Sequence, residues 1–337
     1  MDLFTKKEPS AHSQSHHGHD HTHGALDPAV LTTKQGIRAV QLSFLVLLAT
    51  TLVQVWVVYL SGSVALLADT IHNFGDAATA FPLWVAFAMA RRKPTKSFSY
   101  GFGRVEDLAG VVIVLTILSS GLFAGYEAVT RLLHPPKVDY LGAVVAASII
   151  GFIGNEVVAY YRLKVGNAIG SAALIADGHH ARIDGFASLA VLFGAVGVWL
   201  GFPLADPLIG VVITAVLFKI VWDSGKSVFM RLLDGVDPEV IDEVTHAAQH
   251  VPGILDVTEV RVRWLGHRLL AEINIAVDSA LSVEQGHEIA KEVRHQLLHH
   301  LKYLGNAIIH IDPVNASGEE HHHLSEHSHG NFAAHSH

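Results

Sequence analysis

Uncharged runs as long as a membrane-spanning helix dominate the first two thirds of this sequence. Between Ile37 and Ile220 charged side chains are sparse, whereas residues 1–36 and the C-terminal part are polar or mixed. Half of all residues (50%) are hydrophobic, only 16% are charged, and the mean hydropathy is +0.36. This composition is too apolar for an ordinary soluble domain. It predicts a membrane domain over residues 37–231, followed by a soluble domain over 232–313.

Six spans of about 20 apolar residues, the length that crosses the hydrocarbon core, are predicted. They cover residues 39–60, 63–90, 108–126, 140–161, 171–201 and 207–222. An even number of spans places both termini on one side of the membrane. Five Lys and Arg residues follow the second span in 91–104, Arg162 and Lys164 follow the fourth, and Lys34 and Arg38 precede the first. The positive-inside rule therefore predicts cytoplasmic termini in a multi-pass protein of the cell (inner) membrane.

The pattern changes after the last span. Residues 238–250 and 282–301 suit helices, 255–265 and 268–278 alternate like strands, and a last short strand ends at Pro313. This α-β-β-α-β order predicts a two-layer α+β domain, ferredoxin-like and metallochaperone-like, with helices on one face of a mostly antiparallel sheet. The predicted fold class is an all-α six-helix transmembrane domain plus this C-terminal cytoplasmic α+β domain.

Histidine is abundant, with 25 residues, and cysteine is absent. Any metal chemistry must therefore rest on imidazole and carboxylate. Six histidines lie within residues 12–24 and seven within 314–337. Both tails, 1–36 and 314–337, lack apolar content and are predicted to be disordered. Their interspersed Ser, Gly, Glu and Asn favour native metal-attracting tails over an engineered tag. The net charge of -8 argues against a nucleic-acid partner, and no cleaved signal peptide is expected.

An internal repeat places ionisable residues in the second and fifth spans. SVALLADTIHNFGD (63–76) and SAALIADGHHARID (171–184) align without gaps at an offset of 108 residues, with seven identities in fourteen positions. The ionisable identities are Asp69, His72 and Asp76 in the first copy and Asp177, His180 and Asp184 in the second. Positions i, i+3 and i+7 share one helix face. Repeats with matching polar residues inside spans are typical of transporters.

Two facing stripes would bring two imidazoles and two carboxylates together. The predicted transport site is His72, Asp76, His180 and Asp184, a nitrogen and oxygen set that suits zinc. Ionisable groups inside a bilayer cost at least ~2.5–3.5 kcal/mol each and usually mark an ion path. A single His–Asp pair that joins two helices is the structural alternative, and the duplication argues against it. Asp69 and Asp177 are supporting residues that orient the imidazoles, line the entry path or begin the helices.

With these residues in this order, the sequence resembles the cation diffusion facilitator family, in particular its zinc-type metal/proton antiporters. The resemblance covers nearly the whole chain: six spans, HxxxD in the second and fifth, and the terminal α-β-β-α-β domain. It implies a homodimer that alternates between inward-facing and outward-facing states and exports a divalent metal ion in exchange for protons. The two-His, two-Asp set resembles the zinc-preferring members, with cobalt, nickel and cadmium left open. Members that handle iron or manganese often have Asp in place of the span-two His.

Relatives in this family carry two further metal sites, one in the loop after the second span and one in the cytoplasmic domain. Many relatives carry histidines after the second span, where FSYGFGRVE (98–106) has Phe98 and Phe102. The resemblance therefore implies no metal site in this loop, and Arg104 and Glu106 are expected to make intracellular charge contacts.

In the cytoplasmic domain, the resemblance implies a regulatory zinc site. The matching residues are Glu272, His287, His310 and Asp312, with His267 and His300 as weaker candidates. His310 and Asp312 are two apart on a strand and so point the same way. The alternative is that these are surface histidines of a soluble domain.

The expected activity is secondary active transport, in which protons and metal compete for the same imidazoles. An enzyme is not expected, because an intramembrane metallohydrolase needs a general base such as the Glu of HExxH, and no span contains one. A membrane-anchored metal sensor or receptor is one alternative, but it leaves the repeat unexplained. A transporter selective for Fe2+ or Mn2+ is the other.

Overall fold

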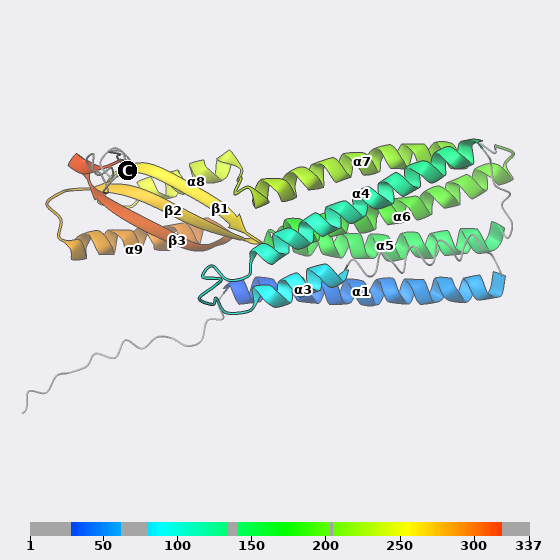
Figure 1. Cartoon of the computed structure of the whole chain (residues 1–337), viewed down its shortest axis with the longest axis horizontal. Coiled ribbons are helices and arrows are strands. Elements are labelled where there is room, and N and C mark those ends of the chain that lie inside the picture. Colours follow the sequence, from blue (N-terminus) through cyan, green and yellow to red (C-terminus); the bar gives the residue numbers. More distant parts are fainter. Residues whose placement is uncertain (1–27, 62–79, 134–140, 203–204, 319–337) are drawn as a thin grey trace, which may run out of the picture.

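Two domains follow one another along the long axis of the molecule (Figure 1). The computed structural model describes residues 28–61, 80–133, 141–202 and 205–318. The helical domain consists, in its described part, of α1 (Pro28–Ser61), α3 (Ala80–Ala90), α4 (Arg104–Leu133), α5 (Leu141–Ile169), α6 (Ala172–Trp199) and α7 (Ala205–Leu232). The sheet domain consists of α8 (Pro238–Gln249), β1 (Ile254–Leu265), β2 (Arg268–Val277), α9 (Val283–His300) and β3 (Leu304–Pro313), followed by the 3-10 turn Val314–Ala316.

Four described helices are long and apolar enough, by length and composition, to cross a membrane. They are Thr32–Val57, Arg104–Thr130, Gly142–Ile169 and Leu208–Leu232. Their outer faces carry large apolar side chains such as Leu52, Phe123 and Trp222, which are 60–73% exposed and suit a lipid environment. α3 is a short apolar helix and is the described part of the predicted second span. α6, with 28 residues, is about 42 Å long at ~1.5 Å per residue but carries charges in its first half.

The helices extend further than the sequence predicts at their sheet-domain ends. The N-terminal tail was predicted to reach residue 36, but α1 already begins at Pro28. Proline suits the first position of a helix, and contacts of Thr32 and Thr33 with the sheet domain order this turn. Arg162, predicted to follow the fourth span, lies instead inside α5 and is 1% exposed. It is therefore not a charge of a cytoplasmic loop.

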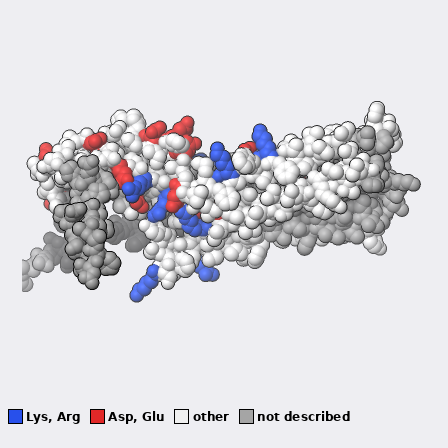
Figure 2. Space-filling view, turned by 45° about the horizontal axis from the view of Figure 1, so that its top comes forward, with Lys and Arg blue, Asp and Glu red and all other residues white. Residues whose placement is uncertain are grey.

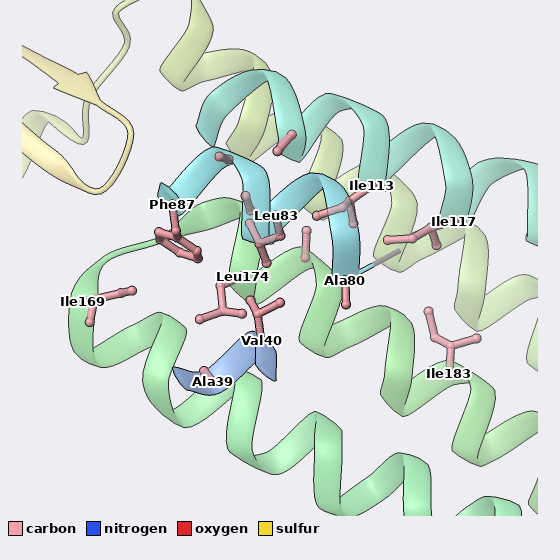
Figure 3. Packing of buried hydrophobic residues seen from close by; sticks show 14 of the residues in the cluster. Ala39, Val40, Ala80, Leu83, Phe87, Ile113, Ile117, Ile169, Leu174 and Ile183 are labelled. Atoms are coloured by element: carbon pink, nitrogen blue, oxygen red, sulfur yellow. The ribbon is translucent and has the colours of Figure 1, made fainter. Parts of the chain in front are cut away.

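The core of the helical domain lies in the half that adjoins the sheet domain. Figure 3 shows Leu83 and Phe87 of α3 packing with Ile113 of α4 and Leu174 of α6, all of them at most 1% exposed. α5 packs along both α1 and α6, and α7 along both α4 and α6. Glycine permits the closest approach, since a Cβ on Gly154 of α5 would overlap the Thr50 hydroxyl of α1.

The sheet domain has the predicted α-β-β-α-β order. Its strands are arranged β1-β2-β3, with β1 and β2 antiparallel and β2 and β3 parallel. The prediction of a mostly antiparallel sheet is therefore corrected to a mixed one, because α9 crosses over between β2 and β3. Alternate β2 residues, Leu269 to Val277, are buried in one core with Val244 of α8 and Val293 of α9. Both helices are capped, α8 by Asp237 and α9 by a Ser282 capping box.

Charged side chains are unevenly distributed between the two domains. On the face shown in Figure 2, Lys, Arg, Asp and Glu gather over the sheet domain and the adjoining end of the helical domain. The described surface beyond this end is almost free of charge in that view. On this face the helical domain thus presents an apolar surface, as a membrane domain does.

Candidate functional site

The second copy of the repeat forms the first half of α6. Gly170, with φ of 73°, ends α5 in the left-handed region, and the Ser171 hydroxyl accepts a hydrogen bond from the Leu174 amide at 3.1 Å, which caps α6. His180 and Asp184 lie one turn apart, with Nδ1 and Oδ2 separated by 3.7 Å. Their side chains are 2% and 8% exposed. The sequence therefore positions an imidazole and a carboxylate close together inside the helical domain.

Asp177, the remaining ionisable residue of the stripe on α6, forms a buried ion pair with a residue of α5. Arg162 Nη1 lies 2.9 Å from Asp177 Oδ2, and the two side chains are 1% and 0% exposed. The same guanidinium nitrogen reaches the Asp177 carbonyl oxygen at 3.5 Å. This contact links α5 to α6 one turn before His180, a structural role that the sequence did not reveal. The predicted supporting roles of Asp177 stay predictions.

A second ion pair joins the same two helices nearer to the surface. Arg182 Nη2 donates to Glu156 Oε1 at 2.7 Å, and both side chains are about one-third exposed (32% and 35%). α5 and α6 are thus joined by two pairs of opposite polarity, since α5 supplies the cation of one and the anion of the other.

Uncharged polar side chains fill the space between α1, α5 and α6. Gln54 is 0% exposed and its Nε2 donates to the Ala147 carbonyl at 3.4 Å. A Cβ on Gly151 would lie 2.8 Å from Ser188 Oγ and 3.0 Å from Gln54 Nε2, so the three helices meet there. Asn155 is 3% exposed and lies against Gly185, next to Asp184. Sequence reasoning did not select Gln54 or Ser188, although their polarity within apolar runs was a usable signal.

The first copy of the repeat, residues 63–76, is not part of the described structure. Asp69, His72 and Asp76 lie outside the described residues. Within the described ranges, no group of three or more His, Cys, Asp or Glu residues is arranged to hold a metal ion. The described part of the chain therefore contains two of the four residues, His180 and Asp184, and the transport site stays a prediction.

The four cytoplasmic candidates are only partly brought together. His310 Nε2 lies 2.9 Å from Asp312 Oδ1, and the two side chains are 55% and 6% exposed. Glu272 lies on the same face of the sheet, with Oε1 3.5 Å from Arg263 Nη2. His287 is exposed on α9. The structure thus places His310 and Asp312 next to each other, and the regulatory zinc site stays a prediction.

His267, a weaker metal candidate, lies elsewhere. It belongs to the hairpin tip, residues 265–267, which comprises the last residue of β1 and the two-residue turn before β2, where Gly266 adopts φ of 61°. Its Nδ1 lies 2.6 Å from Glu106 Oε2 of α4 and its Nε2 lies 3.1 Å from Thr32 Oγ1 of α1. The ring is 3% exposed and packs against Phe87 of α3. The hairpin tip therefore forms a plug between α1, α3 and α4. The contacts of His267 described here are all with these helices, and none of them is with Glu272, His287, His310 or Asp312.

Further contacts join the two domains around this plug. The Gly266 amide donates to Asp107 Oδ2 at 3.1 Å. Arg231 at the end of α7 lies over the Trp264 ring at 3.9 Å, and its Nη1 donates to the Gly170 carbonyl at 2.6 Å. Arg104 pairs with Asp234. The predicted charge contacts of Arg104 and Glu106 are thus found, and Phe98 and Phe102 pack their rings 4.9 Å apart.

Comparison with known proteins decides the family. Residues 40–233 match the cation efflux transmembrane domain, and residues 236–314 match the cytoplasmic domain of cation efflux proteins. The chain belongs to the cation diffusion facilitator family. Cation diffusion facilitators are transporters of the membrane, so this chain is a membrane-integral cation efflux protein.

Named relatives of this facilitator span several metals. A "probable cation efflux system protein" of Mycobacterium tuberculosis is 52% identical over 298 residues, covering 88% of this chain and 90% of that protein. The "cadmium, cobalt and zinc/H(+)-K(+) antiporter" of Bacillus subtilis is 25% identical, covering 84% and 88%. Among solved structures, a cadmium form of the MamM CTD is 29% identical, covers 22% of this chain and 94% of that chain, and has a TM-score of 0.22.

Proposed function

We propose that this facilitator exports a divalent metal ion, zinc foremost, from the cytoplasm in exchange for protons. His72, Asp76, His180 and Asp184 would bind the ion as it passes. The observation that carries the proposal is the burial of His180 and Asp184 on one face of α6, at 2% and 8% exposure, within a domain whose outer surface is apolar. Ionisable groups are costly in such a place and are typically kept for an ion path.

Proton exchange is supported by the chemistry of the ligands. Imidazole binds a metal only in its neutral form and generally titrates near pH ~6.5, so metal and proton exclude one another at the same nitrogen. In the proposed cycle, the cytoplasm-facing state binds the metal and releases protons, and external protons displace the metal after the switch. The Arg162–Asp177 pair keeps α5 and α6 together through this movement, so the switch would move them as a unit.

The distribution of charge supports a cytoplasmic sheet domain. Lys34, Arg38 and Arg91 line, with neighbouring residues, a cavity of about 410 Å³ at the sheet-domain end of α1 and α3. Large aromatic side chains lie exposed near the opposite helix ends, among them Tyr59, 78% exposed, and Trp199, 72% exposed. Basic residues on the cytoplasmic side and Trp or Tyr at the interfaces fit this orientation.

Zinc is favoured by the ligand set, since two imidazoles and two carboxylates suit a tetrahedral ion. The names of the relatives leave the metal open, because one is called a manganese efflux system protein and another a cadmium, cobalt and zinc antiporter. We also propose a homodimer, as the resemblance to the family implies. In one protomer His310 and Asp312 supply two ligands, and His287, Glu272 or residues of a partner subunit would complete a regulatory zinc site.

The test is metal flux into proteoliposomes that contain the purified protein, with zinc, cobalt, nickel, cadmium, iron and manganese compared at fixed pH gradient. His180→Ala and Asp184→Ala should each abolish zinc flux. His179→Ala, on the same turn of α6, is the matched control and should retain it. Full flux in both site variants would remove the proposed site. Zinc flux that ignores the pH gradient would refute antiport, and absence of flux for every metal would favour the sensor alternative.

A further inference from the structure

The two helices of the sheet domain carry the same pattern of metal-binding side chains. Glu243 and His246 of α8 and its C-cap residue His250 have the spacing i, i+3, i+7, and so do Glu292, His295 and His299 in α9. None of these residues belongs to the predicted transport site or to the predicted regulatory zinc site. This spacing places the three side chains of each set on one helix face.

In both helices the structure brings the two imidazoles of the pattern together. The ring centroids of His246 and His250 are 4.2 Å apart, and those of His295 and His299 are 4.4 Å apart. All four rings are exposed, while the opposite faces are fixed in the core through residues such as Val244 and Val293, both 0% exposed. Each helix therefore presents a pair of imidazoles to solvent from a rigid support.

One imidazole is also oriented as metal-binding histidines usually are. His250 Nδ1 lies 2.7 Å from the His246 carbonyl oxygen. Because the carbonyl can only accept, Nδ1 carries a proton, and in the neutral ring the lone pair that binds a metal is then on Nε2. A backbone carbonyl that holds the second ring nitrogen is a common way to fix the tautomer of a metal ligand.

We propose that each pair, His246 with His250 and His295 with His299, binds one divalent transition-metal ion on the surface of the sheet domain. Imidazole nitrogen favours Zn2+, Ni2+ and Cu2+, whereas Ca2+ and Mg2+ take oxygen ligands. Two histidines one helical turn apart on one face are a known way to hold zinc. The rings are exposed, so their side-chain torsions adjust to the ~2.0–2.1 Å bonds that zinc forms with nitrogen.

Each proposed site would leave coordination positions open, and its bound metal ion would exchange rapidly. In the described residues no third His, Cys, Asp or Glu completes either pair, and Glu292 Oε1 instead accepts a hydrogen bond from Gln296 at 2.6 Å. Water fills the remaining coordination positions. If the proposed efflux of metal from the cytoplasm holds, the pairs collect ions beside the transport domain; this role rests on that proposal, whereas the binding itself does not.

The test counts bound Ni2+ by equilibrium dialysis of the full-length protein in detergent. All proteins in the comparison carry glutamine at the tail histidines, in 12–23 and 321–337, to remove their background. We expect H246Q/H250Q and H295Q/H299Q each to bind one Ni2+ fewer per chain. The matched control is H300Q, because His300 has the same ring-to-backbone bond, to Gln296 at 2.9 Å, but no histidine three or four residues away.

A second arm separates a pair from two independent histidines. At substoichiometric Cu2+, electron paramagnetic resonance should show two nitrogen ligands per ion, and H246Q alone should weaken binding at α8 at least tenfold. Unchanged Ni2+ counts in both double variants, or a loss in H300Q equal to theirs, would overturn the proposal. The counts are repeated in the H180A background. Binding that persists there while flux is lost distinguishes the helix pairs from the transport site.

Discussion

The buried pair of Arg162 and Asp177 permits a quantitative prediction. Replacing Asp177 with Asn leaves a guanidinium that is 1% exposed without its counter-charge at 2.9 Å. Breaking a buried ion pair in this way costs ~3–5 kcal/mol. Since both side chains are shielded from solvent, no reduction for screening applies. Asp177→Asn should therefore lower the free energy of unfolding by that amount, a change of roughly 10²–10⁴ in the unfolding equilibrium constant at ~1.4 kcal/mol per factor of ten.

Two further variants make this prediction specific. Glu156→Gln removes one partner of the neighbouring pair, whose side chains are 32% and 35% exposed, and should cost only ~0–1 kcal/mol. The double variant Arg162→Met/Asp177→Leu replaces both charges with apolar groups and should recover most of the loss, because the cost comes from the orphaned charge.

Denaturant unfolding in detergent micelles, followed by tryptophan fluorescence, measures all three variants. The reasoning would be refuted if Asp177→Asn and Glu156→Gln unfolded alike. It would also be refuted if the double variant were as unstable as Asp177→Asn, because the loss would then come from packing and not from charge.

The remaining predictions concern the junction and the tail. Gly103→Val builds a Cβ 2.7 Å from a side-chain atom of the hairpin tip. This variant should make the two domains separate more readily, which would be measured as faster proteolysis between them. Gly142→Val, whose Cβ would have nothing within 4 Å, is the control and should behave as wild type. His267→Leu leaves the Glu106 carboxylate buried without its 2.6 Å donor and should lower stability by ~1.5–3 kcal/mol, and an unchanged melting temperature would contradict this. Deleting residues 1–27 should change the apparent metal affinity in flux assays modestly and leave the maximal rate nearly intact.

The sheet domain could be predicted from the sequence almost residue by residue. Alternation of apolar residues in 268–277 marks a strand with one buried face, and β2 has this pattern in the structure. Ser282 followed three residues later by Gln285 marks the start of α9, and both capping bonds are present. These signals are local, because capping and alternation depend only on neighbours in the chain. The parallel pairing of β2 with β3 is not local, and it was the part predicted wrongly.

The long-range partners of charged residues could not be predicted. Arg162 was assigned to a loop because a lone arginine near a span end usually lies at the membrane surface, and only packing of α5 on α6 reveals its contact with Asp177. His267 was a weaker candidate for the regulatory zinc site, and its partner Glu106 lies 161 residues away in the chain. For the transport site, the repeat predicted the stripe on α6, but spacing alone does not show which helix faces it.

The two ion pairs between α5 and α6 also bear on how the chain enters the membrane. α6 is not among the four described helices that are long and apolar enough, by length and composition, to cross a membrane. A lone Arg or Asp at the centre of an inserting helix costs ~2.5–3.5 kcal/mol, and α6 carries Asp177, Arg182 and Asp184. Arg162 and Glu156 of α5 neutralise two of these charges across a connection of two residues, Gly170 and Ser171. α5 and α6 are therefore expected to leave the translocon together, as a preassembled hairpin whose charges are already matched.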